Sequence, residues 1–373
     1  MRIALFSSAA NVHTPRWVDF FTGRGHEVHL VSIERGRTLC ANQHVLTGGD
    51  GVSQWKVLRS VGRARRLVRE INPDVVLGQY LPSHGFLAAL VDRHPLAVAA
   101  WSPDIPYAVD RHPYDRWRVG LILKRADLTL VCGRHLLDHA RRLGADERRV
   151  AATYVGVDQS VFHPGDDGER DPRLVFTNRE HKNILHVETL IRALPQVCER
   201  VPDARVVIAN DGPRRGALER LAEKLGVRDR CAFVGRLDPE ATAEYLQRSS
   251  LYVSCSEVDG MSISLLEALA CGAYPVVTDI PADREIIEAG ARADLFPVGD
   301  AVGNAVSNAS ALAERLIARL GAPDRLNEDR RVNLEAFRRV GRMEDNLALV
   351  ERRLQALVGG ETFVGEQWAP GPV

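Results

Sequence analysis

The chain has 373 residues, 45% of them hydrophobic and 26% charged, which is typical of a folded protein too long for one ordinary core. It has no apolar run of the roughly 18 residues that a membrane-spanning helix needs. Its N-terminal apolar stretch is too short for a signal peptide, so we expect a cytoplasmic protein. The net charge is zero, but residues 1–164 carry 22 Lys and Arg against 15 Asp and Glu. This excess indicates an anionic partner for the first half.

The first half alternates short apolar strands with helices, the order that a parallel α/β sheet requires. We expect strands at residues 1–7, 28–31, 73–78, 97–100 and 128–132, and a further strand within residues 150–164. We expect helices at residues 16–24, 53–71, 85–93, 117–126 and 135–143. The loop after the first strand has no G-x-G-x-x-G pattern, which argues against a dinucleotide-dependent dehydrogenase.

Polar side chains at the carboxyl ends of these strands are candidate ligand contacts, because open parallel sheets bind ligands there. The acceptor-side candidates are Ala10, Asn11, His13, Arg16, Gln79, His84, Trp101 and Asp104. A single histidine in such a set more often has a structural or surface role than a catalytic one.

The helix expected at residues 53–71 is strongly basic. Such a cluster is most often a solvated helix face, and the functional alternative is contact with an anionic membrane or a phosphate-bearing acceptor. Nucleic acid is disfavoured because no aromatic residues are interleaved and no nucleic-acid motif is present. The cluster consists of Arg59, Arg63, Arg65, Arg66 and Arg69.

The six cysteines lack C-x-x-C spacing and mostly lie in apolar runs, so we expect reduced core thiols and no metal site. They are Cys40, Cys132, Cys198, Cys231, Cys255 and Cys271.

After a polar, Gly- and Pro-containing linker at residues 165–172, the second half repeats the strand and helix alternation. Strands are expected at residues 174–177, 204–209, 231–236, 251–253 and 275–278. Helices are expected at residues 187–200, 215–225, 240–248, 264–271, 283–288, 310–320 and 328–357. We therefore predict two Rossmann-like parallel α/β domains, 1–164 and 165–344, facing each other across a cleft, with a C-terminal helix at about 345–373 that packs back on the first domain.

Residues 254–279 form the most informative stretch. A strand leads into a small polar loop, a helix starts near Ser264, and Glu267 follows Asp259 by eight positions. The N-terminus of a helix attracts anions through its unpaired N–H groups, and a carboxylate in the first turns can accept hydrogen bonds from sugar hydroxyls. The pattern predicts a site for a phosphorylated sugar derivative, although a lone Glu could merely favour the helix dipole.

The chain resembles the retaining glycosyltransferases of family 4, which have the GT-B fold, over nearly its whole length. The matching segments lie in both halves. They are Arg24 to Val28, Trp101 to Ile105, Val155 to Asp158 with Phe162 and Pro164, Asn210 to Pro213, Phe233 to Gly235, and Asp259 to Gly272, together with the first strand and loop with Arg16 and Trp17.

The resemblance implies a nucleotide-diphosphate sugar donor, with UDP- or GDP-sugars expected, and no metal and no cofactor. The family's two acids fall on Asp259, near the donor sugar, and Glu267, on the nucleotide ribose. Arg179 and Lys182 would contact the diphosphate. The other implied donor contacts are Asp211, Gly212, Gly235, Arg236, Gly260, Met261, Ser262 and Ile263.

On the acceptor side the sequence departs from the family. Trp101 stands where many relatives have a histidine, which leaves Asp104, His84 or His13 to handle the acceptor proton. The implied reaction transfers a sugar to a hydroxyl of a sugar, a lipid-linked or a small-molecule acceptor with retention of configuration. A nucleotide-sugar 2-epimerase and a non-catalytic nucleotide-sugar-binding protein are the alternatives.

Overall fold

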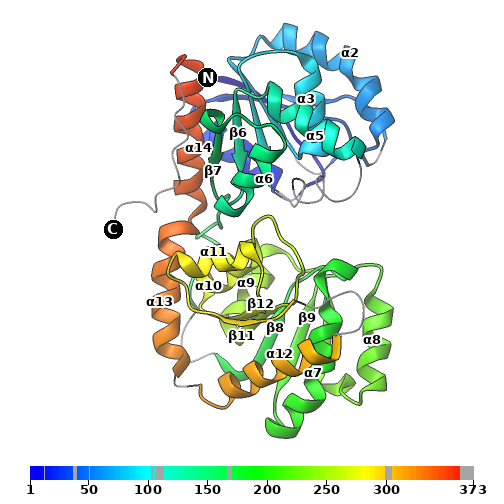
Figure 1. Cartoon of the computed structure of the whole chain (residues 1–373), viewed down its shortest axis with the longest axis vertical. Coiled ribbons are helices and arrows are strands. Elements are labelled where there is room, and N and C mark those ends of the chain that lie inside the picture. Colours follow the sequence, from blue (N-terminus) through cyan, green and yellow to red (C-terminus); the bar gives the residue numbers. More distant parts are fainter. Residues whose placement is uncertain are drawn as a thin grey trace. The chain divides into compact units, whose positions relative to one another are not determined.

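The computed structural model of the chain describes residues 1–11, 13–36, 40–49, 51–101, 105, 113–165, 170–298, 305–323 and 325–361. The chain divides into two compact units (Figure 1). The first comprises Met1–Val155 and the chain from Glu344, and the second comprises Gly156–Met343.

A seven-stranded parallel sheet forms the centre of the first unit, in the order β3-β2-β1-β4-β5-β6-β7. All five residues of β4 and of β5 are buried, because helices cover both faces of such a sheet. The strands are β1 (Arg2–Phe6), β2 (Glu27–Ser32), β3 (Gln43–Val45), β4 (Val75–Gln79), β5 (Leu96–Ala100), β6 (Leu128–Val131) and β7 (Val150–Ala152).

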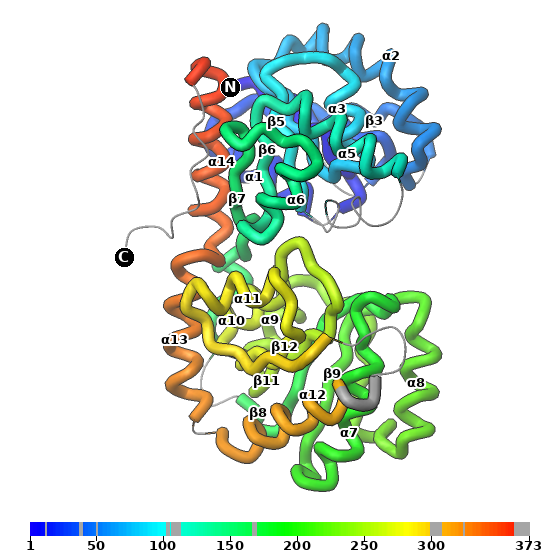
Figure 2. Tube along the Cα trace, viewed as in Figure 1, coloured from blue at the N-terminus to red at the C-terminus, as the bar shows by residue number. Residues whose placement is uncertain are grey.

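The helices of the first unit include α14, which comes from the C-terminal part of the chain and runs beside the sheet (Figure 2). Glu351 of α14 accepts hydrogen bonds from Arg24 Nε (2.6 Å) and His26 Nε2 (2.7 Å), and Arg353 donates to the Ala152 carbonyl (3.1 Å). The helical segments are α1 (Thr14–Gly23), α2 (Gln54–Ile71), the π-helical turn η1 (Leu81–Gly85), α3 (Phe86–Val91), α5 (Pro113–Arg125), η2 (Arg134–Leu136), α6 (Leu137–Arg142), η3 (Glu147–Arg149) and α14 (Met343–Val358).

The second unit has a six-stranded parallel sheet in the order β10-β9-β8-β11-β12-β13. Its strands are β8 (Asp171–Thr177), β9 (Arg205–Ala209), β10 (Cys231–Gly235), β11 (Ser249–Ser254), β12 (Tyr274–Thr278) and β13 (Asp294–Phe296). Its helical segments are η5 (Asn183–Leu185), α7 (Val187–Arg200), α8 (Arg215–Lys224), η6 (Arg228–Arg230), α9 (Pro239–Arg248), α10 (Ile263–Cys271), α11 (Pro281–Glu288), α12 (Ala305–Leu320) and α13 (Arg325–Val340).

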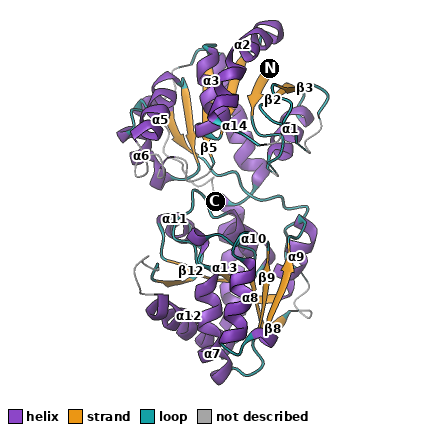
Figure 3. Cartoon of the chain, turned by 90° about the vertical axis from the view of Figure 1, so that its right-hand side faces the viewer, coloured by secondary structure: helices purple, strands orange, loops and turns teal. Residues whose placement is uncertain are grey.

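Helices cover both faces of this sheet as well (Figure 3). On one face α7 packs against α8 and α12, and on the other α10 packs against α9 and α13. The apolar residues of α7 and α12, among them Leu190 and Leu312, join Val253 of β11 in one buried core.

The strand order reverses once in each sheet. β1 lies between β2 and β4, and β8 lies between β9 and β11. At such a point the loops from the two neighbouring strands diverge to opposite faces and leave a crevice at the carboxyl ends, where ligands bind. The topology therefore places one candidate site after β1 and β4 and another after β8 and β11.

The expectation of two parallel α/β sheets, one in each half of the chain, is confirmed. Several details differ from the prediction. The three-residue strands β3 and β13 were not predicted, and β8 begins at Asp171, inside the predicted linker. The helix predicted at residues 328–357 is two helices, α13 and α14, which break at Gly341 and Arg342. At this break the Gly341 carbonyl accepts a hydrogen bond from the Val157 amide (2.7 Å), so tertiary pairing ends the helix.

Four of the six cysteines are buried, as expected for core thiols, and Cys40 and Cys198 are half-buried. Within the described ranges, none of the helices combines the length and the apolar character needed to cross a membrane.

Candidate active site

An ion pair occupies the point of the second unit where the strand order reverses. Arg179 follows β8, and its Nη2 lies 2.8 Å from Oδ2 of Asp259 in the loop after β11. The two side chains are only 13% and 16% exposed. Arg179 Nη1 also donates to Ser264 Oγ of α10 (3.4 Å). The pair therefore joins the two strand ends to the start of a helix.

Arg179 is held in its charged form. Burial alone would lower its pKa, but the adjacent Asp259 carboxylate, together with Tyr252 and Asp283, raises the pKa above the ordinary arginine value. Its Nε is buried and has no hydrogen-bond partner among the described residues. A buried guanidinium N–H without a partner is unfavourable, so a ligand oxygen at this position would be stabilised.

The loop before α10 is fixed by a buried carboxyl group. Ser262, the residue that precedes α10, donates its Oγ proton to Asp283 Oδ1 of α11. Burial raises the pKa of Asp283 to about 7, although the hydrogen bond from Ser262 and the charge of Arg179 act in the opposite direction. Among the predicted phosphate contacts, the Ile263 amide already donates to the Met261 carbonyl (2.9 Å).

Glu267 lies in the second turn of α10 and is 9% exposed. Its Oε2 accepts a hydrogen bond from Asn178 Nδ2 (3.3 Å), and the Asn178 carbonyl accepts one from Asn210 Nδ2 (3.1 Å). Side chains after β8, β9 and β11 are thereby joined in one network. Asn178, the residue before Arg179, thus orients the Glu267 carboxylate.

The ends of β9 and β10 approach each other closely. The Asn210 amide donates to the Gly235 carbonyl (2.5 Å), and the Gly212 amide donates to Asp211 Oδ1 (2.8 Å). A Cβ at Gly212 would lie 2.7 Å from the His181 carbonyl oxygen, so the loop admits only glycine there. Gly235, Asp211 and Gly212 are therefore held together as a backbone surface beside the site.

The remaining predicted donor contacts differ in exposure. Gly260 and Met261 are buried, whereas Arg236 is exposed. Lys182 is half-exposed, and its Nζ lies 2.7 Å from Glu180 Oε2. Arg179 is thus embedded in the site, while Lys182 lies on its surface.

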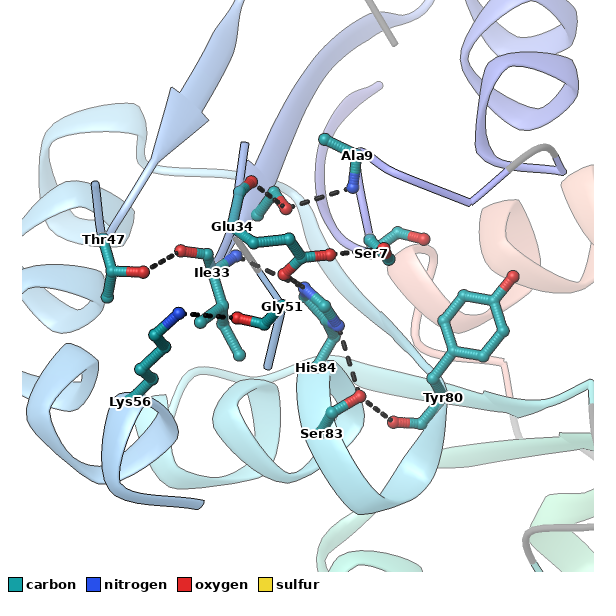
Figure 4. Close-up of polar contacts among 12 residues, drawn as sticks. Ser7, Ala9, Ile33, Glu34, Thr47, Gly51, Lys56, Tyr80, Ser83 and His84 are labelled. Carbon is teal, nitrogen blue, oxygen red and sulfur yellow. Dashed lines mark hydrogen bonds and ion pairs between the residues drawn. The ribbon is translucent and has the colours of Figure 1, made fainter. Parts of the chain in front are cut away.

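A buried polar group occupies the corresponding edge of the first unit (Figure 4). Ser8 Oγ after β1 donates to Glu34 Oε1 after β2, and His84 Nε2 lies 3.4 Å from Glu34 Oε2. Glu34 and His84 are 2% and 1% exposed. Although burial acts to raise the pKa of Glu34, the adjacent His84 and the hydrogen bond from Ser8 lower it below its ordinary value.

The same edge holds two further predicted residues, Gln79 and Arg16. Gln79 Oε1 accepts a hydrogen bond from Ser7 Oγ (2.9 Å), and Ser7 in turn contacts Thr14 (3.0 Å) at the start of α1. Gln79 Nε2 and Arg16 Nη1 are buried without a partner among the described residues. They are donors that a ligand rich in acceptor oxygens could satisfy.

Two other candidates lie near α1. Burial and the neighbouring Arg16 charge lower the pKa of His13 to about 4, so His13 is neutral at physiological pH. The Trp101 ring lies 5.0 Å from that of Trp17, between centroids, in a buried aromatic contact. Ala10 is exposed, and Asn11 Oδ1 accepts a hydrogen bond from the His13 amide (2.8 Å). Asp104 lies outside the described residues.

Three site residues were not predicted from the sequence: Asn178, Asp283 and Glu34. Each is polar and directly follows a strand or begins a helix next to one, which was the available signal. Each lacks a distinctive spacing, and its role becomes visible only when neighbouring strand ends are brought together.

The chain matches two family models, one in each half of the sequence. Residues 167–325 match Glycosyl transferases group 1, and residues 2–131 match Glycosyl transferase 4-like. N-acetyl-alpha-D-glucosaminyl L-malate synthase of Bacillus anthracis is 22% identical over 74% of this chain and 77% of that protein. The GDP-mannose-dependent alpha-(1-6)-phosphatidylinositol dimannoside mannosyltransferase of Mycobacterium tuberculosis is 36% identical, over 38% of this chain and 39% of its own length.

Solved structures agree in fold. Sucrose-phosphate synthase from Thermosynechococcus elongatus superposes with a TM-score of 0.80 at 16% identity, covering 95% of this chain and 99% of that one. Anabaena HepE in complex with UDP and glucose gives a TM-score of 0.78 at 14% identity, covering 96% of this chain and all of HepE.

Proposed function

Because the chain belongs to the group 1, family 4-like glycosyltransferases and depends on a nucleotide sugar, we propose that the Arg179–Asp259 region of its second unit binds the donor diphosphate. The observation that carries this proposal is the buried guanidinium of Arg179, whose Nε has no partner among the described residues. A diphosphate supplies the acceptor oxygens that this group lacks.

The proposed chemistry breaks the bond between the anomeric carbon and the diphosphate oxygen, which keeps the electron pair. The acceptor hydroxyl oxygen forms the new bond on the same face of the sugar, so the configuration is retained. Its proton passes to the departing phosphate oxygen. Arg179, Lys182 and the N-terminal end of α10 stabilise the charge that develops on the diphosphate.

The same proposal assigns to the other donor contacts the roles that the family resemblance implies. Glu267 accepts hydrogen bonds from ribose hydroxyls, and Asp259 faces the donor sugar when the diphosphate engages Arg179. The backbone of Met261 and Ser262 meets the phosphates. Gly235 and Arg236 contact the base, next to Asp211 and Gly212.

UDP- or GDP-sugars are the proposed donors. Anabaena HepE was solved with UDP, and the mycobacterial relative is described as dependent on GDP-mannose. The proposal includes both nucleotides, and a panel of donors separates them.

The acceptor is proposed to bind at the carboxyl edge of the first unit. The donors Gln79 Nε2 and Arg16 Nη1 suit an acceptor with several oxygens, such as a sugar, a lipid-linked sugar or a small hydroxy acid. Glu34 holds Ser8 and His84 in position there, so it is a positioning residue in this proposal. The basic helix α2 further suggests peripheral contact with an anionic membrane at the cytoplasmic face, and no nucleic acid takes part.

A panel of UDP-, GDP-, ADP- and dTDP-sugars tests the proposal, first by thermal shift and then by release of the nucleotide diphosphate with and without acceptors. Stabilisation by one donor and acceptor-dependent release are expected. A changed sugar still attached to its nucleotide would indicate an epimerase. Binding without turnover under any condition would indicate a non-catalytic protein.

A further inference from the structure

The outward face of α2 carries apolar residues near its N-terminal end and arginines toward its C-terminal end, and the exposed Glu70 lies at its border. Viewed down the helix, its members fall within an arc of roughly 100°. The opposite side packs on the unit through Val57, Ala64 and Val68. We define the α2 face as Trp55, Leu58, Arg59, Gly62, Arg66 and Arg69, all of which are exposed.

The N-terminal end of this face is unusually apolar for a surface. Trp55 is 77% exposed and Leu58 47% exposed, and Val52, just before the helix, is 39% exposed. Single exposed hydrophobic residues are normal, but three within seven positions mark an interaction site. Tryptophan in particular favours the boundary between water and lipid.

The C-terminal end of the face opens into a basic cavity of about 560 Å³. Arg65 donates to the Leu90 carbonyl (3.0 Å) and Arg93 to the Pro73 carbonyl (3.2 Å), so neutral backbone oxygens hold these two charges without cancelling them. The acid in the lining, Asp92, is paired with Arg125. Three arginines, Arg65, Arg69 and Arg93, thus surround a space that suits a phosphate.

We propose that α2 lies along an anionic lipid bilayer, with Val52, Trp55 and Leu58 in the interface and a lipid phosphate in the Arg65–Arg69–Arg93 cavity. This lipid site specifies the membrane contact suggested for α2. Its relevance to catalysis rests on the proposed function. Neither feature alone selects lipid. A soluble phosphate would not need the apolar end, and an apolar protein partner would not need the arginines.

The position of α2 links this surface to the acceptor edge. Lys56, in the first turn of α2, donates to the Gly51 carbonyl (2.8 Å), and α2 contacts η1, the turn that holds His84 (Figure 4). A lipid-linked acceptor held at the α2 face would therefore meet the first unit at the edge where the acceptor is proposed to bind.

The experiment uses the full chain and vesicles of phosphatidylglycerol with phosphatidylcholine, or of phosphatidylcholine alone. Co-sedimentation is measured for the wild type, for Trp55→Ser with Leu58→Ser, and for Arg65→Gln with Arg69→Gln. The matched charge control is Arg220→Gln with Lys224→Gln on the exposed side of α8, and the apolar control is Val358→Ser. Thermal shift by the donor sugar is recorded for every variant.

We expect binding to the anionic vesicles that weakens as salt is raised. The arginine pair should lower the affinity roughly 30-fold, since each Arg near an anionic surface contributes about a factor of five. The Trp55/Leu58 variant should lower it at least tenfold, and both controls should bind like the wild type. Donor stabilisation should be unchanged throughout, which separates this proposal from the donor site.

Three results would overturn the proposal. The wild type could ignore vesicles of both compositions, or it could bind equally after the α2 substitutions. Displacement from vesicles by low millimolar glycerol phosphate would assign the cavity to a soluble phosphate instead. Loss of donor stabilisation in the wild type, with vesicle binding intact, would count against the proposed function alone.

Discussion

The carboxyl edges of the two sheets share a topology but use different chemistry. The edge of the second unit holds an arginine and carboxylate pair, 13% and 16% exposed, beside a helix start. The edge of the first unit holds Glu34 and His84, almost fully buried, together with hydroxyl and amide groups. Charge stabilises a leaving diphosphate, whereas a rigid hydrogen-bonded network orients a neutral hydroxyl. The difference therefore matches the proposed division into donor and acceptor sides.

Replacing Arg179 is expected to have the largest effect. Arg179→Ala should lower the transfer rate roughly 100- to 1,000-fold, because one contact to the developing charge contributes about 2.7 to 4 kcal/mol. The control is Arg205→Ala, an arginine 62% exposed and paired with Asp171 at the opposite end of β8. If Arg179→Ala turned over at the wild-type rate, the proposed charge stabilisation at the edge of the second unit would be wrong.

Glu267 tests the nucleotide contact separately from the chemistry. Glu267→Ala should weaken nucleotide binding about 10- to 100-fold, since a hydrogen bond to a charged group contributes roughly 1.5 to 3 kcal/mol. Calorimetry with the nucleotide diphosphate measures this. The control is Glu257→Ala, whose 43% exposed carboxylate pairs with His186. Equal affinity for wild type and Glu267→Ala would exclude the ribose role.

Glu34 tests the acceptor edge. Glu34→Gln should reduce transfer about tenfold while the donor affinity stays unchanged, because Ser8 and His84 lose the carboxylate that positions them. Glu27→Gln, which changes a 47% exposed carboxylate on β2, is the matched control. A change in donor affinity without a change in acceptor use would contradict the division between the two edges.

The two buried acids should respond oppositely to pH. The pKa of Asp283 is raised to about 7, so between about pH 4 and 7 the folded state keeps a proton that the unfolded state has lost. Its contribution to the free energy of unfolding therefore falls as pH rises. The pKa of Glu34 is lowered, so its contribution is present above the ordinary Glu pKa and is lost as pH falls.

Melting curves of Asp283→Asn and of the wild type from pH 4 to 8 measure this difference. Asn cannot ionise, so the melting temperature of the variant should rise by several degrees relative to that of the wild type as pH rises. Glu34→Gln should instead have its largest decrease in melting temperature, relative to the wild type, at the upper end of the pH range. Parallel curves for Asp283→Asn and wild type would mean that Asp283 ionises normally.

The sequence predicted the sheets, and it revealed which residues gather at the edge of the second sheet better than which gather at the edge of the first, for physical reasons. Asp259, the α10 start and Glu267 lie within nine residues, so a local pattern reveals them. Ser8, Glu34 and His84 are spread over 77 residues and meet only because β2, β1 and β4 are neighbours. The short strands β3 and β13 depend on pairing with an adjacent strand, which no local propensity encodes.

The first unit is built from two stretches of chain separated by the whole second unit, and this has a consequence for biosynthesis. Arg24 and His26 find their carboxylate, Glu351, only after the intervening residues have been made. At a translation rate of about 5 to 20 residues per second, the roughly 190 residues of the second unit alone take about 10 to 40 seconds to make. During that interval the apolar surface that α14 later covers is open to other proteins in the cell. We therefore expect the nascent chain to bind chaperones until α14 has left the ribosome.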